Sequence, residues 1–225
     1  MSAIELRAVS KAYDGRTAVD RISASVQRGE RVVLLGPSGC GKTTVLRLVA
    51  GLEVPDSGVV CLDGRPVAQA GRNLVEPEQR HIGMVFQDLA LWPHMTVAQH
   101  LEFALRYDVQ IKLVGRSGRI RDVLEMVRLA DRAQAKPADL SGGEQQRVAL
   151  ARALVAYPGV VLMDEPLSSL DPELNLHLRR EILRLHAELS FTLVYVTHSR
   201  EEAADIGSRV IAIGHGRIDS QAGGP

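Results

Sequence analysis

The sequence predicts an α/β fold: a mostly parallel sheet, an N-terminal antiparallel β subdomain and an inserted helical lobe. Continuous apolar runs at 32–35, 82–86, 160–163 and 192–197 are typical of buried parallel strands. Alternating residues at 4–9, with a second strand near 18–26 and turns at 28–30 and 55–58, indicate antiparallel strands in the first third. Helical patterns at 97–105, capped by Thr96, and at about 119–129 then predict the lobe.

A glycine-rich loop joins strand 32–35 to a predicted helix that ends near Ala50. Glycines leave backbone N–H groups uncovered, and a helix start adds unpaired amides and a positive dipole end. The pattern predicts a P-loop for ATP or GTP, with Lys42 reaching the β- and γ-phosphates and Thr43 binding Mg²⁺. The alternative, a chance glycine-rich connection, is disfavoured by the flanking strand and helix. The loop residues are Gly36, Pro37, Ser38, Gly39, Cys40, Gly41, Lys42, Thr43 and Thr44.

Length and composition limit what surrounds this loop. With 225 residues, 45% of them hydrophobic, the chain has material for one core and an inserted lobe. Lys plus Arg equals Asp plus Glu at 27 each, so no global field attracts nucleic acid. The sequence has no signal peptide, no 18-residue apolar stretch and no metal-spaced cysteine pair. We therefore expect a cytoplasmic protein and no nucleic-acid partner.

Polar residues end three of the predicted core strands. Asp164 follows strand 160–163 and is expected to hold Mg²⁺. Glu165, one residue further along an extended backbone, would face the other way and polarise the water that attacks the γ-phosphate. His198 follows strand 192–197, where it would face the phosphates, and Gln87 follows strand 82–86, where it would point at a ligand. Tyr13, at the end of the first strand, is an ordinary edge tyrosine or an adenine-stacking one.

A second helix start resembles an anion site. Ser141 is placed as an N-cap, and Gly142 and Gly143 leave the first-turn amides of a helix that runs to Tyr157 uncovered. Because the P-loop already surrounds its own nucleotide, this start would serve a nucleotide held by another copy of the chain. The alternative is a plain capped helix.

Taken together, these motifs resemble the ATP-binding subunit of an ABC transporter almost from end to end. Tyr13 resembles the family's adenine-stacking aromatic and Gln87 its Q-loop. The remaining matches are the Walker A loop at 36–43, the signature at 140–147, the Walker B strand at 160–165, the D-loop at 168–171 and the H-loop His198. The resemblance implies one ABC ATPase domain over 1–225, with a catalytic core at 1–87 and 158–225 and a helical lobe at about 88–157.

The resemblance also implies a mechanism and partners. ATP and Mg²⁺ would bind Tyr13 and the P-loop, with Thr43, Gln87 and Asp164 as metal ligands. Two subunits, expected to be a homodimer, would pack head to tail, so that Ser141, Gly142 and Gly143 of one close over the other's ATP. Lys42, Gln87, Glu165 and His198 would be the catalytic residues. The subunit would lie at the cytoplasmic face of the inner or plasma membrane, bound to a permease and served by a substrate-binding protein.

The segment 91–97 resembles importers for polyamines, ferric iron, sulfate or organophosphonates, and 89–95 is expected to dock the permease through Trp92. The competing interpretation is a soluble ABC-type ATPase acting on DNA or ribosomes; the short interval between Gln87 and Leu140 leaves no room for a long coiled coil. A P-loop kinase or GTPase leaves Ser141 to Gly143 and His198 unexplained. Cys40, beside Lys42 at a helix start, is expected to react with alkylating reagents unless it is shielded.

Overall fold

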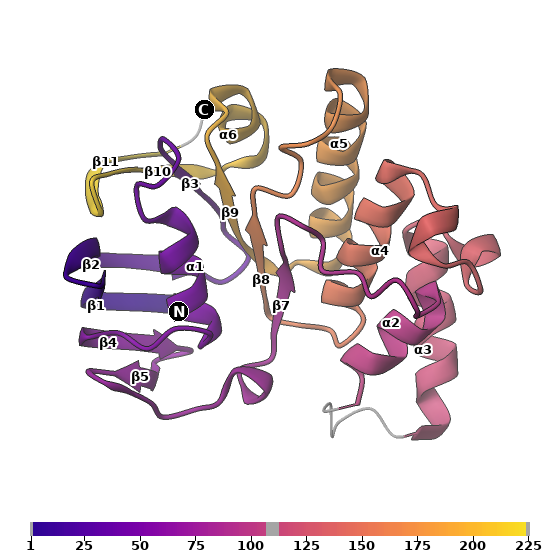
Figure 1. Ribbon diagram of the computed structural model, residues 1–225, viewed down its shortest axis with the longest axis horizontal. Helices are drawn as coiled ribbons and strands as arrows, with labels where there is room; N and C mark the ends of the chain where they lie inside the picture. Colours follow the sequence, from indigo (N-terminus) through magenta and orange to yellow (C-terminus); the bar gives the residue numbers. More distant parts are fainter. Residues whose placement is uncertain (1, 107–112, 224–225) are drawn as a thin grey trace.

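The computed structural model describes residues 2–106 and 113–223, and their backbone forms two sheets and two groups of helices (Figure 1). One sheet is antiparallel, with strand order β2-β1-β4-β5-β6, and the other has order β11-β10-β3-β9-β8-β7. The strands are β1 (Ser2–Tyr13), β2 (Arg16–Gln27), β3 (Arg31–Leu35), β4 (Ser57–Leu62), β5 (Arg65–Gln69), β6 (Arg72–Asn73), β7 (Ile82–Val85), β8 (Val160–Asp164), β9 (Thr192–Thr197), β10 (Arg209–Gly214) and β11 (Arg217–Gly223).

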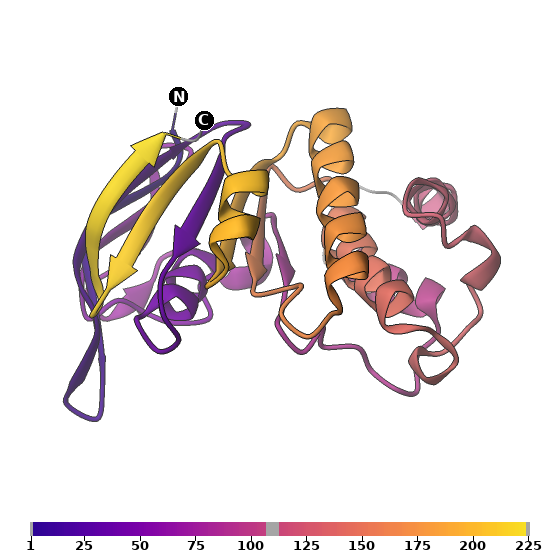
Figure 2. The ribbon, with the colours of Figure 1, turned by 90° about the horizontal axis from the view of Figure 1, so that it is seen from above.

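The helices divide between the sheets and a lobe. Figure 2 shows α2, α3 and α4 grouped on the side of the molecule away from β1 and β2, and α4 packs directly against β7. The α-helices are α1 (Lys42–Ala50), α2 (Val97–Ala104), α3 (Leu113–Met126), α4 (Gly142–Leu154), α5 (Pro172–Leu189) and α6 (Arg200–Ile206). Short 3₁₀ turns are η1 (Pro77–Gln79), η2 (Ala130–Arg132) and η3 (Pro137–Asp139).

The central sheet confirms the predicted parallel core. Strands β10, β3, β9, β8 and β7 pair in parallel, and β11 alone joins antiparallel. Every residue of β8 and β9 is buried, which explains why their sequences are continuous apolar runs rather than alternating ones. Because the carboxyl ends of β3, β8 and β9 lie side by side, the residues that follow them meet at one edge of the sheet.

Two hydrophobic cores cover the two faces of this sheet. One includes Leu46 of α1 with residues of the antiparallel sheet such as Val19 and Val60. The other joins α2, α4 and α5 to the opposite face and includes Leu101 and Leu154, which are fully buried. The P-loop helix and the lobe are thereby fixed to opposite sides of the same strands.

The helix starts follow the expected cap chemistry. Thr96 caps α2 in a reciprocal box with Gln99, and Asp171 caps α5, where Pro172 occupies the first turn. The lobe helix expected at about 119–129 instead starts at Leu113 and ends at Met126. The helix expected to reach Tyr157 ends at Leu154, where the Arg119 guanidinium binds the carbonyl oxygens of Leu154 and Val155.

The sequence analysis missed helix α6 and strands β5 and β6. The signal for α6 was present, because Ser199 caps it and Glu202 follows three residues later. Among the described residues, none of the helices is both long and apolar enough to span a lipid bilayer.

Candidate active site

The P-loop is built by close backbone packing. A Cβ on Gly36 would lie 2.2 Å from the carbonyl oxygen of Ile213, and one on Gly41 would lie 2.3 Å from that of Ala18. Gly41 also has a φ of 107°, which disfavours side chains. Glycine is therefore required at both positions, and the N-cap of α1 carries no side chain that could cover the first-turn amides.

A cavity of about 300 Å³ opens on this loop. It receives side chains from β1, from the loop and from the ends of β7 and β8. Of the predicted site residues it is lined by Tyr13, Ser38, Gly39, Gly41, Lys42, Thr43, Thr44, Gln87 and Glu165. The fold thus brings the aromatic end of β1, the P-loop and Gln87 to one hollow, although they are far apart in sequence.

Lys42 is buried inside its own loop. Its Nζ donates to the carbonyl oxygens of Gly36 and Pro37 at 2.8 and 2.9 Å and lies 3.6 Å from Oε1 of Glu165. With only 3% of its side chain exposed, the ammonium is already drawn out of water. It would exchange carbonyl partners for phosphate oxygens without a further desolvation cost.

Thr43 and Asp164 form the oxygen pair expected for Mg²⁺. The Thr43 hydroxyl donates to Oδ1 of Asp164 at 2.9 Å. Burial raises the pKa of Asp164, and the neighbouring Glu165 raises it further. A cation in front of the carboxylate would offset the free-energy cost of burying its charge.

Among the described residues, the structure contains no cluster of three or more metal-ligating His, Cys, Asp or Glu side chains. Other metal ligands would come from Gln87, phosphate and water, as is usual for Mg²⁺.

The backbone conformation of Glu165 differs from the extended one that the sequence analysis expected. Strand β8 ends at Asp164, and Glu165 has a φ of +43°, so it turns out of the strand instead of continuing an extended backbone. Its N–H donates to the carbonyl of Val196 in the next strand, and its carbonyl accepts from Ser168. This turn places Oε2 3.0 Å from Nδ1 of His198. Strained conformations of this kind are frequent at functional sites.

The Cys40 thiol is buried inside the loop, where its Sγ lies 3.9 Å from Nζ of Lys42. Cys40 is 7% exposed and belongs to the core between α1 and the antiparallel sheet, and its carbonyl accepts from Gly216. Of the two interpretations weighed for this thiol, reactive or shielded, the structure supports shielding.

The signature residues lie at the start of α4, away from the chain's own P-loop cavity. Ser141 caps α4 in a reciprocal box with Glu144, and Arg132 lies 3.3 Å from the Glu144 carboxylate. The hydrogen bond that the backbone N–H of Ser141 donates to the Glu144 carboxylate lowers the pKa of Glu144. Gly143 is buried, and a Cβ there would lie 2.8 Å from Leu174 of α5. None of Ser141, Gly142 and Gly143 lines the P-loop cavity.

The site also contains a residue that the sequence analysis missed. Glu202 of α6 is buried behind His198 and accepts hydrogen bonds from Tyr195, Thr197 and Asn175. Its signal was a glutamate three residues after the Ser199 cap, on a helix that the analysis left out.

Comparisons with known proteins agree with this geometry. The family model described as "ABC transporter" matches residues 19–168. The spermidine/putrescine import ATP-binding proteins of Vibrio cholerae and Oleidesulfovibrio alaskensis are 45% and 48% identical over 222 residues, which is 99% and 98% of this chain. The chain spans 57% of the length of both relatives.

Solved structures agree on the fold. A dimeric ATP-binding cassette in a post-hydrolysis state, bound to ADP and Pi, superimposes with a TM-score of 0.84 at 31% identity over 98% of each chain. An ABC transporter subunit from Clostridium perfringens, part of a larger transporter complex, gives a TM-score of 0.86 at 26% identity, over 99% of this chain and 88% of that one.

Proposed function

The chain belongs to the ABC transporter family of ATP-binding proteins, and from this we propose that it is the ATP-hydrolysing subunit of an importer. The observation that carries the proposal is the meeting of two residue pairs at the P-loop, Thr43 with Asp164 and Glu165 with His198. One pair supplies oxygen ligands for a cation and the other a carboxylate beside an imidazole. The proposed domain is the whole of 1–225, with the core at 1–87 and 158–225 and the lobe at about 88–157.

In the proposed mechanism, the loop amides and Lys42 bind the phosphates and Tyr13 stacks on the adenine. Thr43, Asp164 and Gln87 would hold Mg²⁺, which neutralises the charge that develops on the phosphates during transfer. Glu165 accepts a proton from the attacking water, and His198 orients that carboxylate and contacts the γ-phosphate. The Glu165 carboxylate already contacts His198, so this pair needs little reorganisation before the chemistry, whereas Lys42 turns from its present partners to the phosphates.

A second copy of the chain would complete the site. The amides at Ser141, Gly142 and Gly143 lie outside the chain's own cavity and suit the γ-phosphate of a partner. The Glu144 carboxylate is held by the backbone of Ser141 in the capping box and by Arg132. These contacts offset its negative charge, so that Glu144 need not repel the phosphate. ATP would thus join two subunits head to tail, and hydrolysis would release them.

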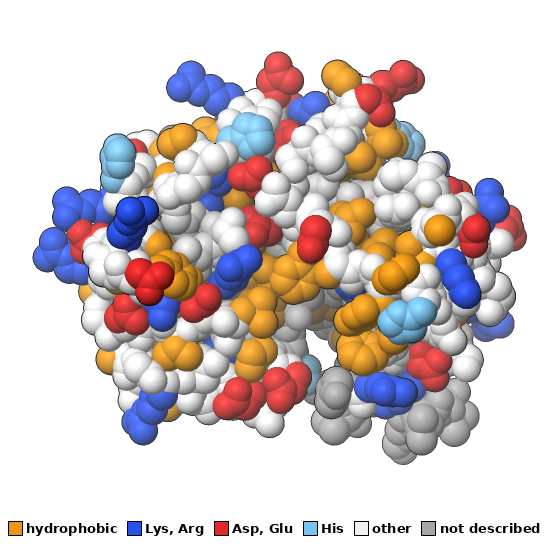
Figure 3. Space-filling view, in the orientation of Figure 1, with side chains coloured by type: hydrophobic (Ala, Val, Ile, Leu, Met, Phe, Trp, Pro, Cys, Tyr) orange, Lys and Arg blue, Asp and Glu red, His pale blue; other side chains and the backbone are white. Residues whose placement is uncertain are grey.

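A groove beside the segment that contains Gln87 is a candidate docking site for the permease. This groove of about 430 Å³ lies between β7, the segment 86–92, α2 and α4. Figure 3 shows hydrophobic side chains gathered near the middle of this face, where the surface is hollowed. The groove is lined by Pro77, Glu78, His81, Ile82, Gly83, Met84, Phe86, Ala90, Trp92, Phe103, Ala104, Arg152, Ala153, Ala156 and Pro158.

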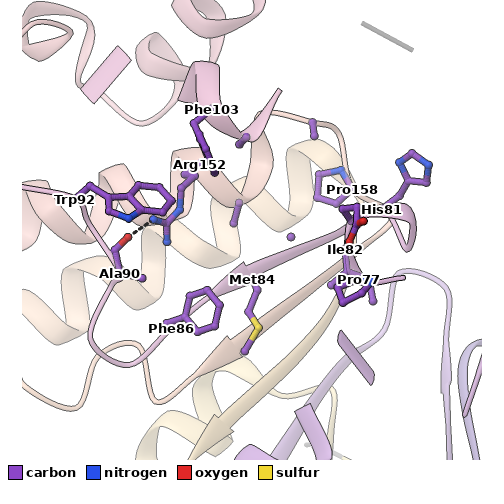
Figure 4. Close-up of a pocket in the computed structure, with 15 residues that line it drawn as sticks. Pro77, His81, Ile82, Met84, Phe86, Ala90, Trp92, Phe103, Arg152 and Pro158 are labelled. Atoms are coloured by element: carbon purple, nitrogen blue, oxygen red, sulfur yellow. Dashed lines mark hydrogen bonds between the residues drawn. The ribbon is translucent and has the colours of Figure 1, made fainter. Parts of the chain in front are cut away.

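Trp92 stands at one side of this groove, opposite Pro77 and Pro158, with Met84 and Phe86 between (Figure 4). It is 37% exposed, packs edge-on against Phe103 and stacks on His100. Its backbone N–H donates to Nε2 of His100 at 2.9 Å. Large aromatics held rigidly in this way are the usual anchors of interfaces, and we propose that Trp92 anchors the permease.

Reconstitution tests the proposal. The purified protein is combined in vesicles with a candidate permease and substrate-binding protein from the same organism, and ATP hydrolysis and uptake of labelled putrescine are measured together. Polyamine is the cargo class that the relatives' names support. Hydrolysis that drives uptake is the expected result. Hydrolysis stimulated instead by DNA or ribosomes, with no effect of the permease, would favour the soluble alternative, and coupled uptake of another solute would change only the cargo.

A further inference from the structure

A buried carboxyl group lies behind the proposed catalytic pair. Glu202 is 6% exposed and comes from α6, the helix that follows His198. Its Oε2 accepts from the Tyr195 hydroxyl at 2.9 Å and from the Thr197 hydroxyl at 2.8 Å. Its Oε1 accepts from Nδ2 of Asn175 at 2.9 Å. All three partners are donors, so these are the charge-assisted bonds of a carboxylate, which are stronger than bonds between neutral groups.

One set of these bonds leads to His198. The Thr197 hydroxyl, which donates to Glu202, also accepts from the backbone N–H of Ser199 at 3.0 Å. The Ser199 hydroxyl in turn accepts from the backbone N–H of Glu202 at 3.3 Å. The residues on both sides of His198 are therefore tied to Glu202, while the imidazole itself remains 54% exposed and is held at its backbone.

The other set leads toward Glu165. Nδ2 of Asn175, which donates to Glu202, also donates to the carbonyl of Leu167 at 3.1 Å. Leu167 is fully buried and lies two residues beyond Glu165, in the turn that carries Glu165 away from β8. The same carboxylate is thus bonded to groups that fix the backbone of both members of the Glu165–His198 contact.

We propose that Glu202 is a positioning residue for ATP hydrolysis, whose buried carboxylate holds His198 and Glu165 at their mutual distance. This inference rests on the proposed function, in which the two residues act at the γ-phosphate. Glu202 does not line the P-loop cavity. Its effect is therefore on the geometry of the pair and not on nucleotide contacts.

The first test compares Glu202→Gln with Glu201→Gln, an exposed neighbour on the same helix. Glutamine keeps the size of the side chain but presents an N–H₂ group to at least one donor, so the three bonds can no longer all form. We expect kcat to fall about tenfold or more, since small misplacements of catalytic groups are costly, while the Kd for ATP changes less than about twofold. Glu201→Gln should match the unmodified protein.

A spectroscopic measurement separates positioning from general loss of stability. Histidine-labelled protein is observed by NMR, with the His198 ring signal assigned from its absence in His198→Gln. We expect the signal to move in Glu202→Gln and to stay in place in Glu201→Gln. An unmoved His198 signal, or an unchanged kcat, in folded Glu202→Gln would overturn the proposal.

Two further variants examine the two sets of bonds and remain usable if Glu202→Gln does not fold. Thr197→Val removes only the hydroxyl between Glu202 and Ser199, and it should move the His198 signal and lower kcat. Asn175→Ala removes the link to Leu167, and it should lower kcat in the same direction. If both keep the normal kcat, the proposal is wrong.

Failure of the proposed function would look different. If the unmodified protein hydrolyses no ATP even with its permease, the proposed function fails. The NMR comparison still reports whether Glu202 holds His198 in place.

Discussion

Nδ1 of His198 lies 3.0 Å from Oε2 of Glu165, while the second oxygen of the same carboxyl group lies 3.6 Å from Nζ of Lys42. Because a carboxylate oxygen can only accept, Nδ1 carries a proton in this contact. The carboxyl group is therefore oriented from both sides before a substrate arrives. The sequence analysis placed all three residues near the phosphates, but the contacts of Glu165 with His198 and Lys42 come from the fold, since the three residues belong to different segments of the chain.

Glu165→Gln should bind ATP but lose turnover, by about 100-fold or more, because the amide accepts no proton from the attacking water. Lys42 and the loop amides remain to bind the phosphates. The variant should also accumulate as an ATP-dependent dimer. Phosphate release and sizing with and without Mg-ATP check both outcomes. Undiminished hydrolysis would remove Glu165 from the role of general base.

Asp164→Asn should separate stability from function. Burial raises the pKa of Asp164, so the folded protein carries this carboxylate at a cost. An amide retains the contact with Thr43, and we expect the free protein to melt at the same or a higher temperature. The Mg²⁺-dependent part of the rise in melting temperature on adding ADP should be largely lost. A normal Mg²⁺-dependent shift in the variant would contradict the assignment of Asp164 to the metal.

Cys40→Ser should hydrolyse ATP at close to the normal rate, since the side chain fills a small buried space and contacts no proposed catalytic atom except Lys42, whose Nζ lies 3.9 Å from the sulfur. Because the thiol is 7% exposed, we expect maleimide to label it slowly in the folded protein. Mass spectrometry after timed labelling measures this rate. Rapid labelling of Cys40 that ATP prevents would restore the interpretation of a reactive thiol.

Trp92→Ala should weaken assembly with the permease by about 2 kcal/mol or more, as loss of an interface anchor does. ATP binding and the basal hydrolysis of the isolated subunit should be nearly unchanged. Leu52→Ala is a suitable control, because Leu52 is 50% exposed and lies outside the groove. A pull-down with the permease, beside basal ATPase and melting temperature, decides the matter. A large drop in melting temperature would identify Trp92 as core instead.

His100 should make the docking segment sensitive to acid. Burial lowers the pKa of His100, whose ring accepts from the N–H of Trp92 and contacts the Thr96 carbonyl. Its folded pKa lies below 6.5, so the unfolded chain binds the proton first. The stabilisation is therefore complete above pH 6.5 and decreases as the pH falls, by at most about 1.4 kcal/mol per pH unit for one proton.

Urea unfolding at pH values of about 7.5 and 5.5 measures this effect. His100→Asn should lose less stability on acidification than the unmodified protein. His186, whose pKa burial also lowers, keeps part of the dependence in both. His177→Asn, at an exposed position, should behave like the unmodified protein. An equal loss in His100→Asn would show that this histidine does not contribute.

Most of the fold could be predicted because its signals are local. The continuous apolar sequences of β8 and β9 indicate full burial, and the caps at Thr96 and Ser141 indicate helix starts. Helix α6 was missed because it has only seven residues and lies between two stronger patterns. Short helices depend on tertiary contacts more than on their own sequence.

The candidate site was predictable at the residues that follow strands. The order of the motifs along the chain identifies these residues. The backbone turn at Glu165 and the burial of Lys42, in contrast, depend on neighbouring strands and loops. The role of Glu202 could not be read from its weak sequence signal for a similar reason. A glutamate near a helix start is ordinary, and only the fold shows that Tyr195, Thr197 and Asn175 converge on it.

The guanidinium of Arg152 donates to the carbonyl oxygens of Leu89 and Ala90, in the segment just before Trp92 (Figure 4). Arg152 lies near the far end of α4, the helix that begins beside Ser141. A helix of this length spans about 20 Å and is stiff. In the proposed assembly, this helix would act as a strut between the permease near Trp92 and the neighbouring subunit's phosphate at Ser141. A displacement at either end of α4 would then move the other end with it as a rigid body.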